Sequence, residues 1–154
     1  MKKILIGTHN KGKFREISSL ISRKYRKISP ISLKIKSPKE TGKTFIANSR
    51  LKVKFFSKYV DYPVISDDSG LCIKALNNKP GIYSARLAKK YGSFSKAMKF
   101  ILKKMKAKKN RSAFFVCSLS YHDENGRITS VEGKVKGNIS IKMRGTNGFG
   151  YDPI

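Results

Sequence analysis

Two adjacent carboxylates, Asp67 and Asp68, lie between the apolar runs 63–65 and 71–73. Acidic residues are scarce in this chain, nine against 35 Lys and Arg, so their placement is informative. Buried carboxylates are costly unless they are paired, and they can serve as general bases or bind divalent cations. Successive side chains of an extended segment point to opposite faces, so only one carboxylate can face a given cleft while the other caps or braces the turn. The alternative is a hairpin turn, because Asp, Ser and Gly are common in turns.

The segment 8–13, Thr-His-Asn-Lys-Gly-Lys, has the composition of an anion-binding turn. It follows the apolar run 4–6, and apolar residues recur after it at helical spacing. The backbone N–H groups and the positive dipole at a helix start can receive an anion. Thr8 and Asn10 would add side-chain donors, and the two lysines would add positive charge. The alternative is an ordinary strand–helix turn with a polar cap. The segment lacks the G-x-G-x-x-G pattern of dinucleotide-binding folds.

Glu40 is an isolated acid in a basic region, just before an expected helix. It could interact favourably with the helix dipole, or it could bind a metal ion. Gly42-Lys43-Thr44 superficially resembles a P-loop, but the first glycine of that motif would fall on Ser37, and no strand leads directly into it. We therefore interpret this segment as a loop that enters a helix.

Hydrophobic periodicity predicts strands and helices in alternation. Strands are expected over residues 2–7, 27–36, 71–76, 111–121 and 128–135, together with a central strand that leads into Asp67. Helices are expected from about residue 13 to residue 25, over 44–59 and over 93–105. Asn48 and Lys52 lie four apart in the second helix, so both could reach one cleft. Residues 123–126 predict a hairpin turn, and residues 83–86 are expected to precede a basic linker.

Composition favours one domain with a real core, because 39% of the 154 residues are hydrophobic. No apolar run is long enough to span a membrane, and the start is too short for a signal peptide. Cys72 and Cys117 are predicted to be buried thiols in a reducing cytoplasm, and two histidines without a cysteine cluster do not support a zinc site.

The formal net charge of +26 favours binding to nucleic acid. The excess consists mostly of lysines, 27 against 8 arginines, spread along the whole chain. Base reading and bidentate phosphate recognition favour arginine, so the charge alone does not indicate specific nucleic-acid recognition. A basic nucleic-acid-binding protein nevertheless remains an alternative function.

Five motifs occur in a fixed order. They are Thr8-x-Asn10-x-Gly12-Lys13, Glu40-Thr41-Gly42-x-Thr44-Phe45, Ser66-Asp67-Asp68-Ser69-Gly70-Leu71, Pro80-Gly81-Ile82-Tyr83-Ser84-Ala85-Arg86 and Gly148-Phe149-Gly150-Tyr151-Asp152-Pro153. In this respect the whole chain resembles the inosine triphosphate pyrophosphatase family, the Ham1-like pyrophosphatases of non-canonical purine nucleotides. The resemblance implies an α/β fold with an elongated central mixed β-sheet flanked by helices. It also implies a cytoplasmic homodimer that hydrolyses ITP, dITP and XTP to the monophosphate and pyrophosphate with Mg²⁺.

The resemblance also implies roles for individual residues. Asp68 would be the general base and, with Glu40, would bind Mg²⁺. Lys52 would lie near the phosphates, and Ser69 would contact the substrate. The triphosphate-binding loop would consist of Thr8, His9, Asn10, Lys11, Gly12 and Lys13. The base and sugar end would be lined by Phe149, Gly150, Tyr151 and Asp152.

The sequence departs from the family pattern at three places. His9 stands where a small residue is usual, and Ala47 stands where many members have Glu. Family members also continue past Tyr-Asp-Pro with a helix that carries a lysine and a Ser-His-Arg segment for purine recognition. We therefore expect residues 1–154 to form a single ITPase-like domain that is incomplete at its C-terminus. A truncated form that binds nucleotide without hydrolysing it is the first alternative function.

Overall fold

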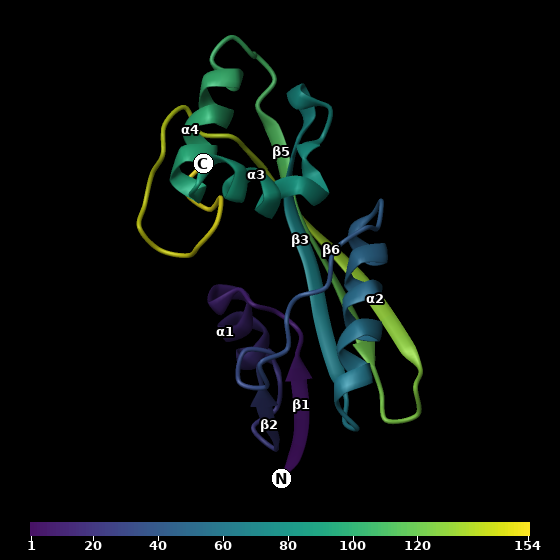
Figure 1. Cartoon of the computed structure of the whole chain (residues 1–154). Helices are drawn as coiled ribbons and strands as arrows, with labels where there is room; N and C mark the ends of the chain where they lie inside the picture. The colour runs from purple at the N-terminus through teal and green to yellow at the C-terminus, as the bar shows by residue number, and fades with distance from the viewer. The chain divides into compact units, whose positions relative to one another are not determined.

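The computed structural model describes residues 1–154 and contains six strands in one mixed sheet (Figure 1). The strand order is β2-β1-β3-β5-β6, and β4 also pairs with β3. The strands are β1 (Lys2–Ile6), β2 (Tyr25–Ile28), β3 (Val64–Ile73), β4 (Lys79–Pro80), β5 (Ser112–His122) and β6 (Ile128–Asn138). The α-helices are α1 (Lys11–Leu20), α2 (Phe45–Phe56), α3 (Ser84–Tyr91) and α4 (Phe94–Met105). The predicted α/β fold with a mixed sheet and flanking helices is confirmed.

The chain divides into two compact units. Unit 1 contains residues 1–68 and 118–132, and unit 2 contains residues 69–117 and 133–154. Strands β3, β5 and β6 each have residues in both units. The carboxylate pair and the segment 8–13 both belong to unit 1, so the geometry that relates them is contained in one unit.

The sheet of unit 1 is built around β1, which pairs in parallel with β2 on one side and with β3 on the other. Leu5 is fully buried and is in register with Val64 of β3. The short apolar run of β1 is typical of a strand covered on both faces. With Val53 and Phe56 of α2, these residues form the core of unit 1.

Strand β3 is continuous through the carboxylate pair, so the hairpin-turn alternative is wrong. Asp67 is 1% exposed and Asp68 is 5% exposed, in the middle of the strand. Asp is disfavoured within strands, and buried charge has to be compensated by its neighbours. The side chains that compensate these two carboxylates therefore define the polar centre of unit 1.

Thr44 caps the start of helix α2, where its hydroxyl accepts a hydrogen bond from the Ala47 N–H at 3.1 Å. The helix runs alongside β3 (Figure 1) and buries Asn48, Ser49 and Lys52 as well as the apolar residues Val53 and Phe56. The predicted helix over 44–59 is thus largely confirmed, with residues 57–59 forming a 3-10 turn.

The core of unit 2 consists of residues from the end of β3, from α3, α4 and β5, together with Ile139 and Tyr151. Ile73, Ile101 and Met105 are among its fully buried members. Helix α4 follows the predicted apolar stripe, and Ser93 caps it by accepting the Lys96 N–H at 3.1 Å.

Several local predictions are wrong. The strand expected over 27–36 is the shorter and earlier β2, and Lys34 has a positive φ of 57° that no strand tolerates. The basic linker expected after residue 86 lies within helix α3, which has lysines in its last turn, where they favour the helix dipole. Cys72 is buried as predicted, whereas Cys117 is exposed. None of the helices is long and apolar enough to cross a membrane.

Candidate functional site

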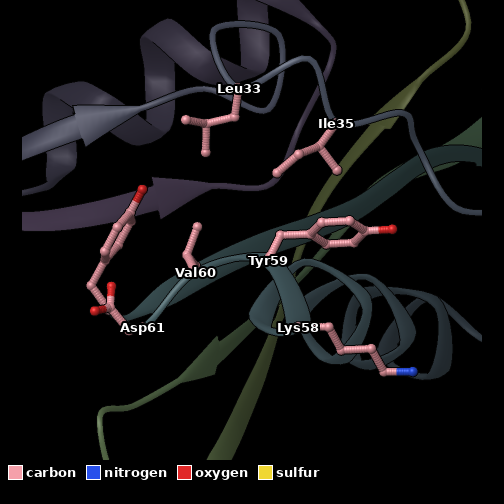
Figure 2. Close-up of a pocket in the computed structure, with 7 residues that line it drawn as sticks. Leu33, Ile35, Lys58, Tyr59, Val60 and Asp61 are labelled. Carbon is pink, nitrogen blue, oxygen red and sulfur yellow. The ribbon is translucent and has the colours of Figure 1, made fainter.

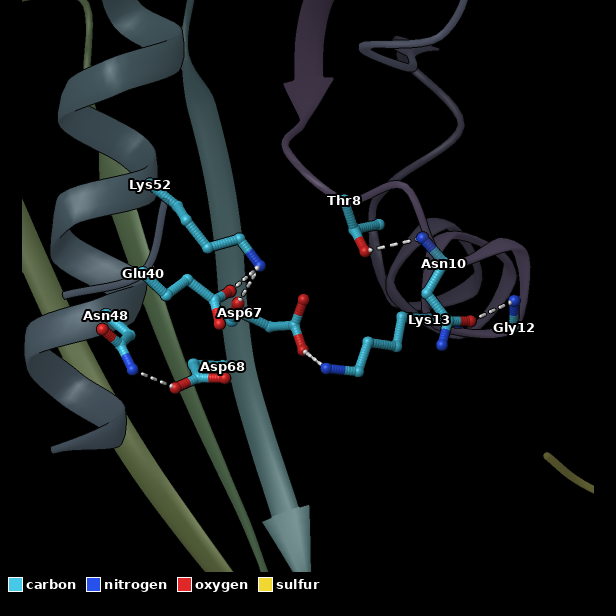
Figure 3. Close-up of polar contacts among 9 residues, drawn as sticks. All are labelled: Thr8, Asn10, Gly12, Lys13, Glu40, Asn48, Lys52, Asp67 and Asp68. Carbon is cyan, nitrogen blue, oxygen red and sulfur yellow. Dashed lines mark hydrogen bonds and ion pairs between the residues drawn. The ribbon is translucent and has the colours of Figure 1, made fainter. Parts of the chain in front are cut away.

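The two carboxylates of β3 face different helices of unit 1 (Figure 3). Asp67 Oδ2 lies 2.7 Å from Lys13 Nζ of α1, whereas Asp68 Oδ2 accepts a hydrogen bond from Asn48 Nδ2 of α2 at 2.9 Å. This is the alternation expected of neighbouring residues in a strand. Asp67 therefore anchors α1. Asp68 faces the loop and helix that carry Glu40 and Lys52.

The surroundings of Asp68 change its readiness to lose a proton. Burial raises the pKa of Asp68 from its ordinary value of 3.8 to about 6, against the opposing effect of the Asn48 hydrogen bond. The charge of Glu40 raises this pKa further, and the charges of Lys52 and Lys13 lower it. A carboxylate with a pKa near neutrality can exchange a proton under ordinary conditions, as a general base must.

Lys52 links Glu40 to the central strand. Its side chain is 8% exposed, its Nζ donates to the Asp67 carbonyl oxygen at 2.7 Å, and the same atom lies 3.5 Å from Glu40 Oε1 (Figure 3). An ammonium buried this deeply requires such partners. Lys52 thus places a positive charge among the acidic side chains, where it could also contact a bound phosphate.

The segment 8–13 comprises the turn after β1 and the first three residues of α1. Asn10 caps the helix, and its Oδ1 accepts the N–H groups of Gly12 at 2.8 Å and Lys13 at 3.2 Å. The Thr8 hydroxyl accepts the Asn10 N–H at 3.2 Å. The cap therefore already occupies two of the backbone N–H groups that were expected to bind an anion. Binding of an anion would then depend more than expected on the lysine charges and on the other hydrogen-bonding groups of the segment.

Four residues of this turn, from Thr8 to Lys11, line a hollow of about 480 Å³. Phe14, Arg15, Ser29 and Ile31 complete its lining. His9 lies at the edge of the turn, where its Nε2 donates to the Ile35 carbonyl oxygen at 2.9 Å. The turn therefore combines cations and hydrogen-bonding groups with space for a ligand.

A different hollow of unit 1, of about 570 Å³, is lined mainly by apolar and aromatic side chains (Figure 2). Its lining comprises Leu33, Ile35, Lys58, Tyr59, Val60, Asp61 and Tyr62. Only one carboxylate and one ammonium are present there. The acids and lysines required for phosphate chemistry are instead gathered around β3 and the start of α1.

The acidic side chains around β3 are candidate ligands for a metal ion. No group of three or more His, Cys, Asp or Glu side chains in the chain is arranged to hold a metal ion. Mg²⁺ has different requirements, because it is commonly bound by one or two carboxylates together with water and substrate phosphates. The donor set of Glu40 and Asp68 fits that chemistry.

Comparison with known proteins identifies the family of the chain. The model of the Ham1 family matches residues 4–154. The dITP/XTP pyrophosphatase of Zymomonas mobilis is 40% identical over 156 residues, which cover 99% of this chain and 75% of that protein. This chain belongs to the Ham1 family.

Two solved structures of Ham1 proteins share the fold. The Staphylococcus aureus Ham1 protein is 37% identical with a TM-score of 0.86, and the match covers 99% of this chain and 80% of that one. The Coxiella burnetii HAM1 protein is 33% identical with a TM-score of 0.87, and the match covers 100% and 81% of the two chains.

In this Ham1 chain, the remaining predicted site residues belong to unit 2. Ser69 follows Asp68 in β3 and is partly exposed. Tyr151 is 4% exposed, donates from its hydroxyl to the Ser84 carbonyl oxygen at 2.7 Å, and packs edge-to-face on Phe94. Burial raises the pKa of Tyr151 to about 12. Its side chain therefore has a structural role in unit 2, and a contact with the base or sugar stays a prediction.

The other members of the closing segment are more accessible. Phe149 and Gly150 are partly exposed, and Asp152 is exposed. The Asp152 carboxylate accepts the Phe149 N–H at 2.9 Å, which closes a turn around Gly150. Their assignment to the base and sugar end also stays a prediction.

Two residues of the cluster were not among the predicted site residues. Asp67 binds Lys13, and Asn48 binds Asp68. The spacing of Asn48 and Lys52 did indicate that both could reach one cleft, and the alternation of a strand indicated a bracing role for the second carboxylate. Neither pattern identified the partner, because α1 and α2 meet β3 only in the folded chain.

Proposed function

We propose that this Ham1 chain hydrolyses non-canonical purine nucleoside triphosphates, such as ITP, dITP and XTP, to the monophosphate and pyrophosphate. Membership of the family and the relative named dITP/XTP pyrophosphatase support this activity. The observation that carries the proposal for this chain is the buried Asp68, which has a pKa of about 6 and lies among the charges of Glu40, Lys52 and Lys13. Such a group suits the deprotonation of water at a phosphorus atom.

The segment 8–13, called the basic turn from here on, would bind the triphosphate. Lys11 and Lys13 would neutralise phosphate charge, and the positive end of the α1 dipole would add to the attraction. The ion pair with Asp67 holds the Lys13 ammonium in place before substrate arrives. Binding would therefore require little rearrangement of this side chain, which limits its entropic cost.

Glu40 and Asp68 would hold Mg²⁺, which when bound would neutralise charge on the phosphates. Asp68 would also accept a proton from the attacking water, so that the resulting hydroxide attacks the α-phosphorus and pyrophosphate leaves. Lys52 would approach the same phosphates from α2. The low exposure of Asp68 and Lys52 keeps bulk water away from these charges, which strengthens their electrostatic effect.

We propose that residues of unit 2 recognise the base and the sugar of the substrate. Ser69 would contact the substrate, and Phe149, Gly150, Tyr151 and Asp152 would line the base and sugar end. We also propose that the active form is a homodimer. Light scattering coupled to size-exclusion chromatography measures the mass directly, and a mass equal to one chain at micromolar concentration would contradict the dimer.

Product analysis tests the activity. The chain should release pyrophosphate from ITP or XTP in the presence of Mg²⁺ and little from ATP or GTP. Asp68→Asn should abolish turnover while nucleotide binding persists, because only the proton acceptor and one ligand charge are lost. Orthophosphate as the product would contradict attack at the α-phosphorus. Binding of nucleotide without any turnover by the unaltered chain would instead favour the inactive nucleotide-binding form.

A further inference from the structure

Asn48 connects two segments that carry acidic side chains. It is fully buried on α2, its Nδ2 donates to Asp68 Oδ2 at 2.9 Å, and its Oδ1 accepts the Gly42 N–H at 2.7 Å. Figure 3 shows the Asn48 amide directed at Asp68. An ionised carboxylate can only accept and a backbone N–H can only donate, so these partners fix which end of the amide faces each of them.

We propose that Asn48 is a positioning residue that sets the geometry of the divalent cation site. This inference rests on the proposed function, because it takes Glu40 and Asp68 as the ligands of Mg²⁺. One end of the amide orients Asp68, and the other end fixes the backbone two residues after Glu40. Side chains that orient metal ligands contribute strongly to metal affinity without touching the metal.

The loop that carries Glu40 has little freedom beside Asn48. A Cβ atom at Gly42 would lie 2.5 Å from Asn48 Oδ1 and 2.9 Å from Ala47 Cβ, so the backbone packs directly against the start of α2. Glu40 itself is held by its ion pair with Lys52, one helical turn after Asn48. Asn48 and Lys52 thus fix the loop backbone and the Glu40 carboxylate, respectively.

Ser49 offers a matched comparison for the effects of packing. It is also fully buried on α2, but its hydroxyl hydrogen-bonds to Ser120 Oγ at 2.7 Å and to the Ile46 carbonyl oxygen at 3.0 Å. These bonds involve neither Glu40 nor Asp68. Ser49→Ala therefore perturbs the same helix without releasing a proposed metal ligand.

The test measures how much Mg²⁺ strengthens nucleotide binding. Calorimetric titration with α,β-methylene-ITP, which cannot be cleaved at the α–β bridge, gives the dissociation constant with and without Mg²⁺. Asn48→Ala should reduce the gain in affinity due to Mg²⁺ by about tenfold or more. Binding without the metal should change by less than about twofold, because it depends on the lysines of the basic turn. Ser49→Ala should keep the full gain.

Asn48→Leu provides a second variant of similar volume, and thermal unfolding checks that each variant is folded. Retention of the full Mg²⁺ gain in a folded Asn48 variant would overturn the inference. If Asn48→Ala and Ser49→Ala both weakened nucleotide binding equally with and without Mg²⁺, the inference would also be overturned. Asn48 would then have only a packing role. Absence of any Mg²⁺ gain in the unaltered chain would overturn the proposed Mg²⁺ site itself, which distinguishes the two failures.

Discussion

Asp68 combines a destabilising position with a proposed catalytic role. It lies within a strand at 5% exposure, and the Asn48 amide compensates only part of the cost of its charge, as its raised pKa shows. Asp67, its neighbour, is 1% exposed and forms an ion pair with Lys13. The contrast is what the proposed catalytic role of Asp68 requires, because a carboxylate that is only partly compensated lowers stability but can still exchange a proton.

This cost predicts a pH-dependent gain in stability for Asp68→Asn. The pKa of Asp68 in the folded chain is raised, so its contribution to stability is fully present below pH 3.8 and is lost as the pH rises through about 6. Ionisation should therefore cost the unaltered chain about 3 kcal/mol at pH 8, and the variant avoids this cost. Urea unfolding without divalent metal should show the variant gaining stability over the unaltered chain between pH 4 and pH 8.

Asp123→Asn is a suitable control, because Asp123 lies in the β5–β6 turn and accepts backbone N–H groups there rather than contacting the carboxylate cluster. A difference between Asp68→Asn and the unaltered chain that does not change with pH would contradict the proposed cost of ionisation.

At the scale of elements, the start of α1 serves both stability and the proposed binding of phosphate. Asn10→Ala removes the cap on the Gly12 and Lys13 amides and should lower the free energy of unfolding by about 1 kcal/mol. It should also weaken binding of α,β-methylene-ITP, because the turn that presents the lysines loses its fixed conformation. Chemical denaturation and calorimetry measure the two effects.

Ser93→Ala removes the cap of α4 in unit 2 and supplies the control. It should cost a similar free energy of unfolding without affecting nucleotide binding. If both cap variants weakened binding equally, the effect would come from general stability and the basic turn would have no special part in it.

The junction between β1 and α1 also requires a glycine. A Cβ atom at Gly7 would collide with Ser66 Oγ and would lie 2.5 Å from Phe56 Cδ2, both of which are fully buried. Gly7→Ala should therefore lower the free energy of unfolding by about 2 kcal/mol or more, since overpacking in a core forces backbone shifts. Gly133→Ala, at a strand position with open space around it, should change stability by less than about 0.5 kcal/mol. Equal urea midpoints for the two variants would contradict this account.

The elements best predicted from sequence are those with regular apolar spacing. Helix α4 and strand β5 agree with their predicted ranges to within one or two residues, and the hairpin turn at Asp123 is correct. The predicted position of β2 is wrong, because Arg26 is exposed, the other three residues are only partly buried, and their apolar pattern is weak. The hairpin alternative at Asp67 failed for a different reason: turn-forming residues stand inside a strand that tertiary contacts stabilise.

At the scale of the whole molecule, the order of the sequence motifs predicted the family correctly, although several predictions of local structure were wrong. The basic turn, Glu40, Lys52 and the carboxylate pair are separated in sequence by up to 60 residues, yet unit 1 brings them into one connected set of ion pairs and hydrogen bonds. The sequence could not predict these pairings, because they depend on the parallel pairing of β1 with β3 and on the placement of α2. It could predict only which residue types were available.

The net charge of +26 is a second property of the whole chain. The distribution of the lysines in the structure favours a non-specific attraction for nucleic acid. Lysines occur in both units, and Lys74, Lys134 and Lys136 line a hollow of about 560 Å³ in unit 2. Binding to duplex DNA should therefore be driven by counterion release, with affinity falling by about a thousandfold between 50 and 200 mM salt. Fluorescence anisotropy measures this dependence.

Because the charge is dispersed, no single pair of lysines should dominate the binding of DNA. Lys134→Gln with Lys136→Gln should weaken binding about as much as Lys103→Gln with Lys104→Gln, a pair in the last turn of α4. A loss confined to the first pair would identify a dedicated nucleic-acid surface, and binding that persisted at 200 mM salt would support the same conclusion. Equal losses would instead assign the charge to a general attraction for polyanions, which also raises the local concentration of triphosphate substrates.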